Sequence, residues 1–226
     1  MSIELTKPTT KLDQLNSEYD PLTGLERLER VFYEFDPERI LVTSSFGSTA
    51  AILLHMISKV APGHPIYFVN TGYMFEETLA YKKAMVEQLG LNVIDKGAPI
   101  NQHQFTQENE SWKYKSDLCC FINKVNPTNK LREGKDIWIS GLMRYQNANR
   151  GKLRVFEPKD DLLKFHPIID MTSEEVHTYA TIYELSFNPL IYQGYGSIGC
   201  THCTAKGEGR EGRWLNSTKT ECGLHV

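Results

Sequence analysis

The sequence predicts an α/β fold with a doubly wound, mostly parallel sheet. Short runs of aliphatic and β-branched residues alternate with longer segments whose apolar residues recur at helical spacing. Strands that alternate with helices form parallel sheets, because a parallel neighbour can be reached only through a crossover connection. Ligands of such sheets bind beyond the carboxyl ends of the strands, so the loops there are the first place to look for a site.

Strand, polar loop and helix recur along the first two thirds of the chain. Asp20-Pro21 favours a helix start, because aspartate caps the first turn and proline lacks a donor that this turn leaves unused. Gly90 ends a later helix, since glycine adopts the left-handed conformation at low cost. The expected elements are a helix from 22 to 32, strands at 40–43, 66–69, 91–94 and 137–140, helices at 50–57 and 76–89, and a helix carrying Cys119 and Cys120.

With 226 residues the chain is expected to form one domain with terminal extensions. Residues 1–19 are polar and are expected to form a flexible N-terminal segment. Residues 20–205 form the predicted domain, in which Thr172 and Glu175 make a capping box that opens a short helix. Glycines then recur with little periodicity, which predicts a loop-rich, mobile C-terminal tail over 206–226.

Charge and hydropathy exclude several classes of protein. A net charge of -3 argues against a general nucleic-acid binder. The sequence has no apolar run near the roughly 18 residues of a membrane span, and its first residues lack the apolar segment of a signal peptide. A cytoplasmic protein is therefore expected. In a reducing cytosol, cysteines serve as ligands or nucleophiles more often than as structural disulfides.

Five cysteines fall into a group of four and a single one. Cys119-Cys120 and the C-x-x-C of Cys200 and Cys203 form the group, and Cys222 lies near the end of the sequence. Adjacent side chains diverge, so they reach separate irons of a cubane cluster more easily than they share one tetrahedral zinc. A 4Fe-4S cluster is favoured, and zinc is the alternative. A redox dithiol is disfavoured because this C-x-x-C follows a glycine-rich loop and not a strand.

Cys222 is the candidate nucleophile. A free thiol on a terminal segment is a liability unless its reactivity is used, and nearby cations or a bound ligand favour the reactive thiolate. The alternative is an incidental terminal cysteine. His225, three residues further on, is a candidate contact for an anionic substrate, or else an ordinary solvated histidine.

The residues from Ser44 to Ser48 lie between a predicted strand and a predicted helix. Backbone N–H groups, hydroxyls and the helix dipole together suit a phosphate or sulfate there, although such turns are also common as plain connectors. Arginine forks bind the oxygens of these anions in pairs, whereas a plain reading makes most basic residues solvated surface charges. The predicted substrate-binding residues are Ser44, Ser45, Gly47, Lys124, Arg144, Arg150, Arg210, Arg213 and His225.

Taken together, several motifs resemble one known family. The chain is similar to the assimilatory sulfonucleotide reductases, and most similar to their adenylylsulfate (APS) reductase branch, from about residue 20 to the end. The terminal box and the paired cysteines are highly specific, whereas the serine loop is shared with the wider adenine nucleotide alpha hydrolases. The motifs are Ser44-Ser45-Phe46-Gly47, Thr71-Gly72-Tyr73, Cys119-Cys120 with Lys124, Gly194 to Thr204 with its C-x-x-C, Gly212-Arg213-Trp214, and Glu221-Cys222-Gly223-Leu224-His225.

The resemblance implies a fold, a reaction and a cofactor. The sheet would be of the adenine nucleotide alpha hydrolase type, and the enzyme would reduce APS to sulfite and AMP during sulfate assimilation and cysteine biosynthesis. Cys222 would attack the sulfur and become an S-sulfonate, from which thioredoxin or a glutaredoxin-like dithiol releases sulfite. Lys124 would sit between the substrate and a 4Fe-4S cluster. We also expect a homo-oligomer. The implied cluster ligands are Cys119, Cys120, Cys200 and Cys203.

Three positions depart from the family pattern, and three other functions stay open. Asn123 and Met143 stand where arginines are usual, and Thr49 stands near a position that is often acidic. These changes thin the predicted anion pocket. A reductase of the 3'-phosphorylated nucleotide (PAPS) is the nearest alternative. An ATP-using thiolation enzyme would need a fuller Ser-Gly-Gly-x-Asp-Ser loop, and a non-catalytic iron-sulfur sensor would not need the terminal box.

Overall fold

A computed structural model describes residues 10–214, 223 and 224 of the chain. It contains a six-stranded sheet made of β1 (Ile40–Ser44), β2 (Ile66–Val69), β3 (Val93–Lys96), β4 (Ile137–Ile139), β5 (Phe156–Lys159) and β6 (Leu162–Phe165). The strand order is β3-β2-β1-β4-β6-β5. Every neighbouring pair is parallel except β5 and β6, which run antiparallel. The predicted α/β fold with a mostly parallel sheet is confirmed.

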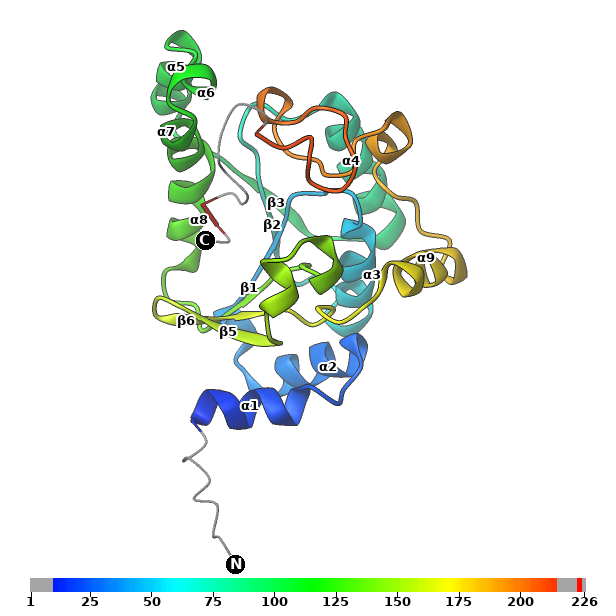
Figure 1. Cartoon of the computed structure of the whole chain (residues 1–226). Coiled ribbons are helices and arrows are strands. Elements are labelled where there is room, and N and C mark those ends of the chain that lie inside the picture. The colour runs from blue at the N-terminus through cyan, green and yellow to red at the C-terminus, as the bar shows by residue number, and fades with distance from the viewer. Residues whose placement is uncertain (1–9, 215–222, 225–226) are drawn as a thin grey trace, which may run out of the picture.

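Helices cover both faces of the sheet, as the doubly wound prediction requires. In Figure 1, α3, α4 and α9 lie on one side, and the helices from α5 to α8 form an arm on the other. A π-helical turn at Phe121–Val125 joins α7 to α8. The helices are α1 (Lys11–Tyr19), α2 (Gly24–Glu34), α3 (Ala50–Val60), α4 (Glu76–Leu89), α5 (Ile100–Glu108), α6 (Ser111–Tyr114), α7 (Ser116–Cys120), α8 (Asn126–Arg132) and α9 (Ser173–Ile182).

The centre of the sheet is β1, whose first three residues are buried. Val42 lies opposite Ile66 of β2 and Ile139 of β4, which fixes the register of three parallel strands. A strand that is covered on both faces needs apolar residues in succession, and this explains the run Ile40-Leu41-Val42. The carboxyl ends of these strands therefore meet at one edge of the sheet.

The helix α3 packs against this strand with an almost continuous apolar sequence. Residues 51 to 57 are all buried, including the partly polar His55. A helix that is apolar on every side belongs in a core. Within the described part of the chain, no helix has both the length and the apolar composition that a membrane crossing requires.

The N-terminal region differs from the prediction. Residues 11–19 form α1, which begins at a capping box between Thr10 and Asp13. Asn16 and Tyr19 are fully buried. The side-chain Nδ2 of Asn16 donates to the carbonyl of Phe156 in β5, and its Oδ1 accepts from the Phe156 N–H. The expected flexible segment is therefore wrong for residues 11–19. The next helix begins at Gly24 behind a Thr23 cap, not at Asp20-Pro21.

The second difference is the hairpin of β5 and β6, which is absent from the strands that the sequence predicts. Asp160, at φ 52°, makes the tight turn between the two strands. Further on, the glycine-rich segment is irregular, as expected, but its described part is packed and not loose. The Gly207 N–H donates a hydrogen bond of 2.9 Å to the Gly194 carbonyl, and Trp214 is 6% exposed.

Candidate active site

A cavity of about 420 Å³ opens at the carboxyl ends of β1, β2 and β4. The loop from Ser44 to Thr49 forms its floor and leads directly into α3. Thr49 is the N-cap of α3 but makes no capping hydrogen bond with its side chain. The N–H groups of Ala50 and Ile52 donate long hydrogen bonds of 3.3 and 3.4 Å to the carbonyls of Gly47 and Thr49, and the helix dipole favours an anion at this end of the helix.

Phe46 gives the loop its shape. Its backbone is in the left-handed region, at φ 48°, while its side chain is fully buried against Phe68 at a ring-centroid distance of 5.6 Å. A bulky residue in this conformation costs about 1–3 kcal/mol, which the buried ring and a hydrogen bond of 2.9 Å from Asn188 to the Phe46 carbonyl offset. Phe46 belongs to the serine-loop motif, but this anchoring role was not predicted from the sequence.

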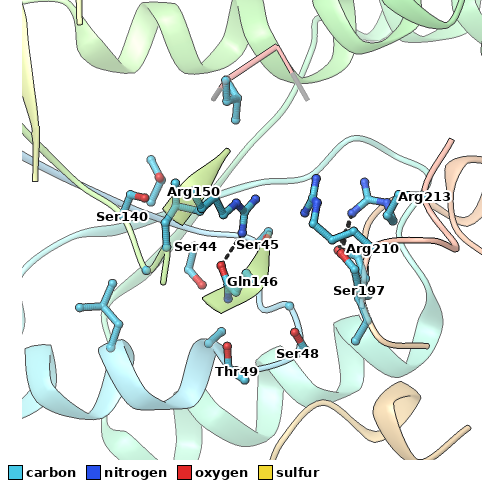
Figure 2. A pocket seen from close by; sticks show the side chains of 18 of the residues that line it. Ser44, Ser45, Ser48, Thr49, Ser140, Gln146, Arg150, Ser197, Arg210 and Arg213 are labelled. Atoms are coloured by element: carbon cyan, nitrogen blue, oxygen red, sulfur yellow. Dashed lines mark hydrogen bonds between the residues drawn. The ribbon is translucent and has the colours of Figure 1, made fainter. Parts of the chain in front are cut away.

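Three arginines face the cavity from two different segments. Figure 2 shows the side chain of Arg150 pointing from one side of the cavity, and those of Arg210 and Arg213 from the other, above the Ser44–Thr49 loop. Arg150 is 8% exposed and is held by a hydrogen bond to Gln146. The guanidinium of Arg213 lies 4.3 Å from the ring centre of Trp214. Fixed guanidinium groups around a helix N-terminus suit a phosphate or sulfate.

Most predicted substrate-binding residues therefore meet at one cavity. Ser44, Ser45, Gly47, Lys124, Arg150, Arg210 and Arg213 all line it. Arg144 does not, because its Nε donates to the Leu153 carbonyl at 2.9 Å. Its neighbours Tyr145 and Gln146, which the sequence analysis did not select, line the cavity instead. Of the three departures, Thr49 lines the cavity, Met143 is buried in the core and Asn123 is 2% exposed.

Lys124 also lines a second, smaller cavity of about 20 Å³ beside the first. This cysteine cavity is formed by Thr71, Tyr73, Trp112, Cys119, Cys120, Asn123, Lys124, Cys200, His202 and Cys203. The two cysteine pairs are brought together from segments that are some eighty residues apart in the sequence. One lysine consequently stands between the arginine-lined cavity and four thiols.

Cys119, Cys120, Cys200 and Cys203 are thiols and not disulfides, and their surroundings differ. Burial raises the pKa of the Cys119 thiol to about 12, and the nearby Cys120 and Cys200 act in the same direction, while a hydrogen bond from Asn123 lowers it. Thr71 Oγ1 lies 3.2 Å from Cys200 Sγ. Next to them, Trp112 and His202 stack with ring centres 4.1 Å apart and planes 7° apart.

Four cysteines are a donor set for a cluster or for one tetrahedral ion. A zinc ion with bonds of about 2.3 Å would draw its four sulfurs into close mutual contact. Among the described residues, no three His, Cys, Asp or Glu side chains stand close enough to hold a single metal ion. The four cysteines that line one cavity match the four thiolate ligands of a multi-iron cluster in kind and number.

The end of the chain returns to the larger cavity. Leu224 lines it and packs against Leu41, Trp138 and Leu162 on the sheet. Gly223 lies close to Val125, since a Cβ built on this glycine would be 3.0 Å from Val125 Cγ2. The predicted nucleophile Cys222 and the predicted contact His225 lie outside the described residues.

A parallel sheet with an arginine-rich cavity at its strand ends is typical of nucleotide-binding α/β proteins. Comparison with known families makes this specific. The model of the phosphoadenosine phosphosulfate reductase domain matches residues 39–206. The chain belongs to this family, the sulfonucleotide reductases.

Relatives with two different names match over nearly the whole chain. A phosphoadenosine 5'-phosphosulfate reductase of Vibrio atlanticus is 32% identical and covers 100% of this chain and 90% of its own. An adenosine 5'-phosphosulfate reductase of Bacillus cytotoxicus is 35% identical and covers 98% and 99%. That of Chelativorans sp. is 34% identical and covers 94% and 90%. Both substrate classes thus occur at the same level of identity.

Solved structures place the fold in the same group. The phosphoadenylyl-sulfate reductase of Candida auris, solved as a phosphate complex, superimposes with a TM-score of 0.74 at 25% identity, covering 91% of this chain and 100% of that one. Yeast FAD synthetase has a TM-score of 0.57 at 12% identity and covers 89% and 70%, which shows a shared fold alone. The expected adenine nucleotide alpha hydrolase type of sheet is confirmed.

Proposed function

We propose that the chain reduces adenosine 5'-phosphosulfate to sulfite and AMP, with Cys222 as nucleophile and a 4Fe-4S cluster on Cys119, Cys120, Cys200 and Cys203. The observation that carries the proposal is the position of Lys124, which lines both the anion cavity and the cysteine cavity. An ammonium group at this position can pair with a sulfate in the one and with thiolates in the other.

The larger cavity supplies the binding of the nucleotide. The phosphosulfate would lie over the Ser44–Thr49 loop, where the α3 N–H groups and the cationic side chains of Arg150, Arg210 and Arg213 converge. Cations in place before the reaction stabilise charge that develops on the departing phosphate without having to reorganise. His225 remains a proposed contact of the same anion.

The proposed reaction begins when the thiolate of Cys222 lies next to the phosphosulfate. Cys222 Sγ attacks the sulfur of the sulfate group, the bond from that sulfur to the bridging oxygen breaks, and AMP leaves with the bridging oxygen. A cysteine S-sulfonate remains. A thiolate of an external dithiol protein, thioredoxin or a glutaredoxin-like partner, then attacks Cys222 Sγ, and sulfite departs with the electron pair. The second thiol of the partner resolves the mixed disulfide, so the partner supplies both electrons.

The position of Leu224 supports the role of Cys222. The covalent chain holds Cys222 two residues from a side chain that lines the nucleotide cavity. A terminal segment that joins a cavity by a few contacts can deliver its thiol first to the substrate and then to a protein partner. A bound cluster would supply a fixed charge distribution beside the anion. Lys124 would lie between the cluster and the substrate and would interact with both.

The first test is anaerobic incubation with the nucleotide in the absence of any thiol, followed by peptide mass analysis. We expect one sulfonate on Cys222 and one AMP for each chain. Cys222→Ser should lose this adduct and all sulfite formation, and it should keep the iron and sulfide content of the parent. Sulfite formed at the parental rate by Cys222→Ser would reject the thiol mechanism.

Reduction of PAPS is the second candidate, because relatives named for it match as well as the others do. A 3'-phosphate would add two negative charges and would need a further cation at the ribose end of the cavity. Sulfonate transfer from equal concentrations of the two nucleotides, followed as AMP against adenosine 3',5'-bisphosphate, decides between them. Predominant release of the bisphosphate would assign PAPS and leave the thiol mechanism intact.

The proposed place of action is the cytoplasm, in sulfate assimilation. A cytoplasmic pool of dithiol proteins is reducing enough to regenerate Cys222 on every turnover. A homo-oligomer is part of the same proposal, and sedimentation of the purified chain with and without AMP tests it.

A further inference from the structure

The side-chain amide of Asn123 is buried, and the groups around it determine which end donates hydrogen bonds and which end accepts them. Its Nδ2 lies 3.1 Å from the carbonyl oxygen of Cys119 and 3.7 Å from Cys119 Sγ, and it is 2.9 Å from Thr106 Oγ1. A carbonyl oxygen only accepts hydrogen bonds, so the NH₂ group of Asn123 must face Cys119. A flipped amide would put two acceptor oxygens against each other.

The other end of the amide is held as firmly. Asn123 Oδ1 lies 3.0 Å from His103 Nδ1, and because this oxygen accepts, His103 Nδ1 carries a proton and donates it. The His103 ring packs over Gly72, where a Cβ would lie 2.3 Å from its Cε1. Gly72, at φ 77°, is the residue type that permits both this backbone conformation and this close approach.

Thr106 accounts for one of the two N–H groups of Asn123. Its hydroxyl proton goes to the His103 carbonyl at 2.8 Å, which leaves two lone pairs to accept. Tyr73 OH, at 2.9 Å, and Asn123 Nδ2 fill these two places. The second N–H of Asn123 is therefore directed at Cys119, where the carbonyl oxygen and the sulfur share it.

We propose that Asn123 is a positioning residue for Cys119, and that its N–H···S bond fixes this sulfur toward the cysteine cavity and tunes the cluster held there. The inference rests on the proposed 4Fe-4S site. A hydrogen bond to a ligand sulfur withdraws electron density from the iron–sulfur unit and raises its reduction potential. The π-helical turn that contains Asn123 begins one residue after Cys120, and turns of this kind recur at functional sites.

Two substitutions separate the N–H group from the rest of the side chain. Asn123→Asp keeps an oxygen for His103 but has no N–H for Cys119, and Asn123→Leu removes both bonds at similar volume. Asn16→Leu is the matched control, since Asn16 is also a fully buried asparagine bonded to backbone groups, and it contacts α1 and β5 and no cysteine. Each full-length protein is loaded anaerobically with iron and sulfide.

The readouts are iron and sulfide content, the midpoint potential of the cluster, and the iron–thiolate stretching bands in the resonance Raman spectrum. We expect both Asn123 variants to show a lower midpoint potential and higher stretching frequencies than the parent, or to lose iron selectively. Asn16→Leu should match the parent in all three. If a cluster resists reduction, the Raman bands alone decide.

Three results would overturn the inference, and they differ from one another. Parental spectra and potential in both Asn123 variants would reject the role of Asn123 and leave the proposed function intact. Equal loss of iron from the Asn123 variants and from Asn16→Leu would show general destabilisation and also reject it. A parent chain that binds no iron and sulfide would reject the cluster and this inference together, while sulfonate transfer to Cys222 would still be measurable.

Discussion

Lys164 Nζ donates a hydrogen bond of 2.6 Å to the backbone carbonyl oxygen of Leu224. Lys164 is 7% exposed, and its ammonium also lies 4.9 Å from the ring centre of Trp138. A residue of β6 thus holds the chain two positions after the proposed nucleophile. The contact joins β6 to the C-terminal segment.

Lys164→Met should slow sulfonate transfer to Cys222 about tenfold, because a hydrogen bond from a charged donor contributes about 1.5–3 kcal/mol. The apolar stem is conserved, so the effect reports the lost bond. Transfer is followed as modified tail peptide against time. Lys59→Met, at an exposed lysine on α3, is the control. Equal rates in the two variants would show that this bond does not position the segment.

Gly199→Ala should weaken nucleotide binding about tenfold and lower the unfolding free energy by about 1 kcal/mol. The new Cβ would lie 2.3 Å from Arg213 Nη2, so the guanidinium must move and lose its hydrogen bonds to the carbonyls of Cys203 and Ile198. Calorimetric titration with AMP and urea unfolding measure the two quantities. Gly151→Ala, where the nearest atom is 3.9 Å away, is the matched control. Parental AMP affinity in Gly199→Ala would argue against Arg213 as a ligand.

His166 should make the protein less stable at mildly acidic pH. Burial, followed by the charge of Lys164, lowers the pKa of His166 to about 3. In the unfolded chain His166 binds a proton below its pKa of about 6.5, whereas in the folded protein it does so only below about pH 3. The free energy of unfolding therefore falls as the pH falls between these two values. The loss at pH 5 is about 2 kcal/mol relative to pH 7.

The variant His166→Gln should remove this part of the pH dependence. Urea unfolding at pH 7 and pH 5 gives the difference directly, and it should shrink by about 2 kcal/mol relative to the parent. His177→Gln, at an exposed position, should leave the difference as it is. An unchanged difference in His166→Gln would mean that other groups carry the acid sensitivity.

Arg27→Lys should destabilise the fold by about 3 kcal/mol. Arg27 is 1% exposed, and its guanidinium bonds to both carboxylate oxygens of Asp170 at 2.7 Å and to the carbonyls of Tyr19, Asp20 and Pro167. One ammonium cannot satisfy all of these acceptors. Arg30→Lys on the same helix pairs with exposed glutamates and should cost less than about 1 kcal/mol. Equal midpoints in urea for both variants would contradict the prediction.

The core of the fold was predictable because burial leaves a mark on the sequence. Strand β1 begins with three buried apolar residues, residues 51–57 of α3 are buried and mostly apolar, and Gly90 ends α4 in the left-handed conformation, at φ 63°. The hairpin of β5 and β6 was missed because each strand has only four residues and β5 contains Pro158 and two charged residues. Its stability comes from partners such as Asn16, which lies 140 positions from Phe156.

The motifs of the candidate site were predictable because their residues are neighbours in the sequence. Contacts that form only when the chain folds were not. The serine loop and the cysteine pairs are visible as motifs, and they do line the two cavities. The exclusion of Arg144 could not be predicted, because it depends on a carbonyl at Leu153 that only the folded chain brings near. The Asn123 bonds to His103 and Thr106 are hidden for the same reason.

Because Lys124 lines both cavities, anion binding in the larger cavity and charge in the cysteine cavity are thermodynamically linked. An anion that enters the larger cavity changes the field of this ammonium at the thiols, and a change of charge among the thiols alters its attraction for the anion. Linkage requires the two effects to be equal in free energy. Whatever occupies the cysteine cavity therefore acts as an effector of nucleotide affinity, and the nucleotide acts as an effector of the cysteines.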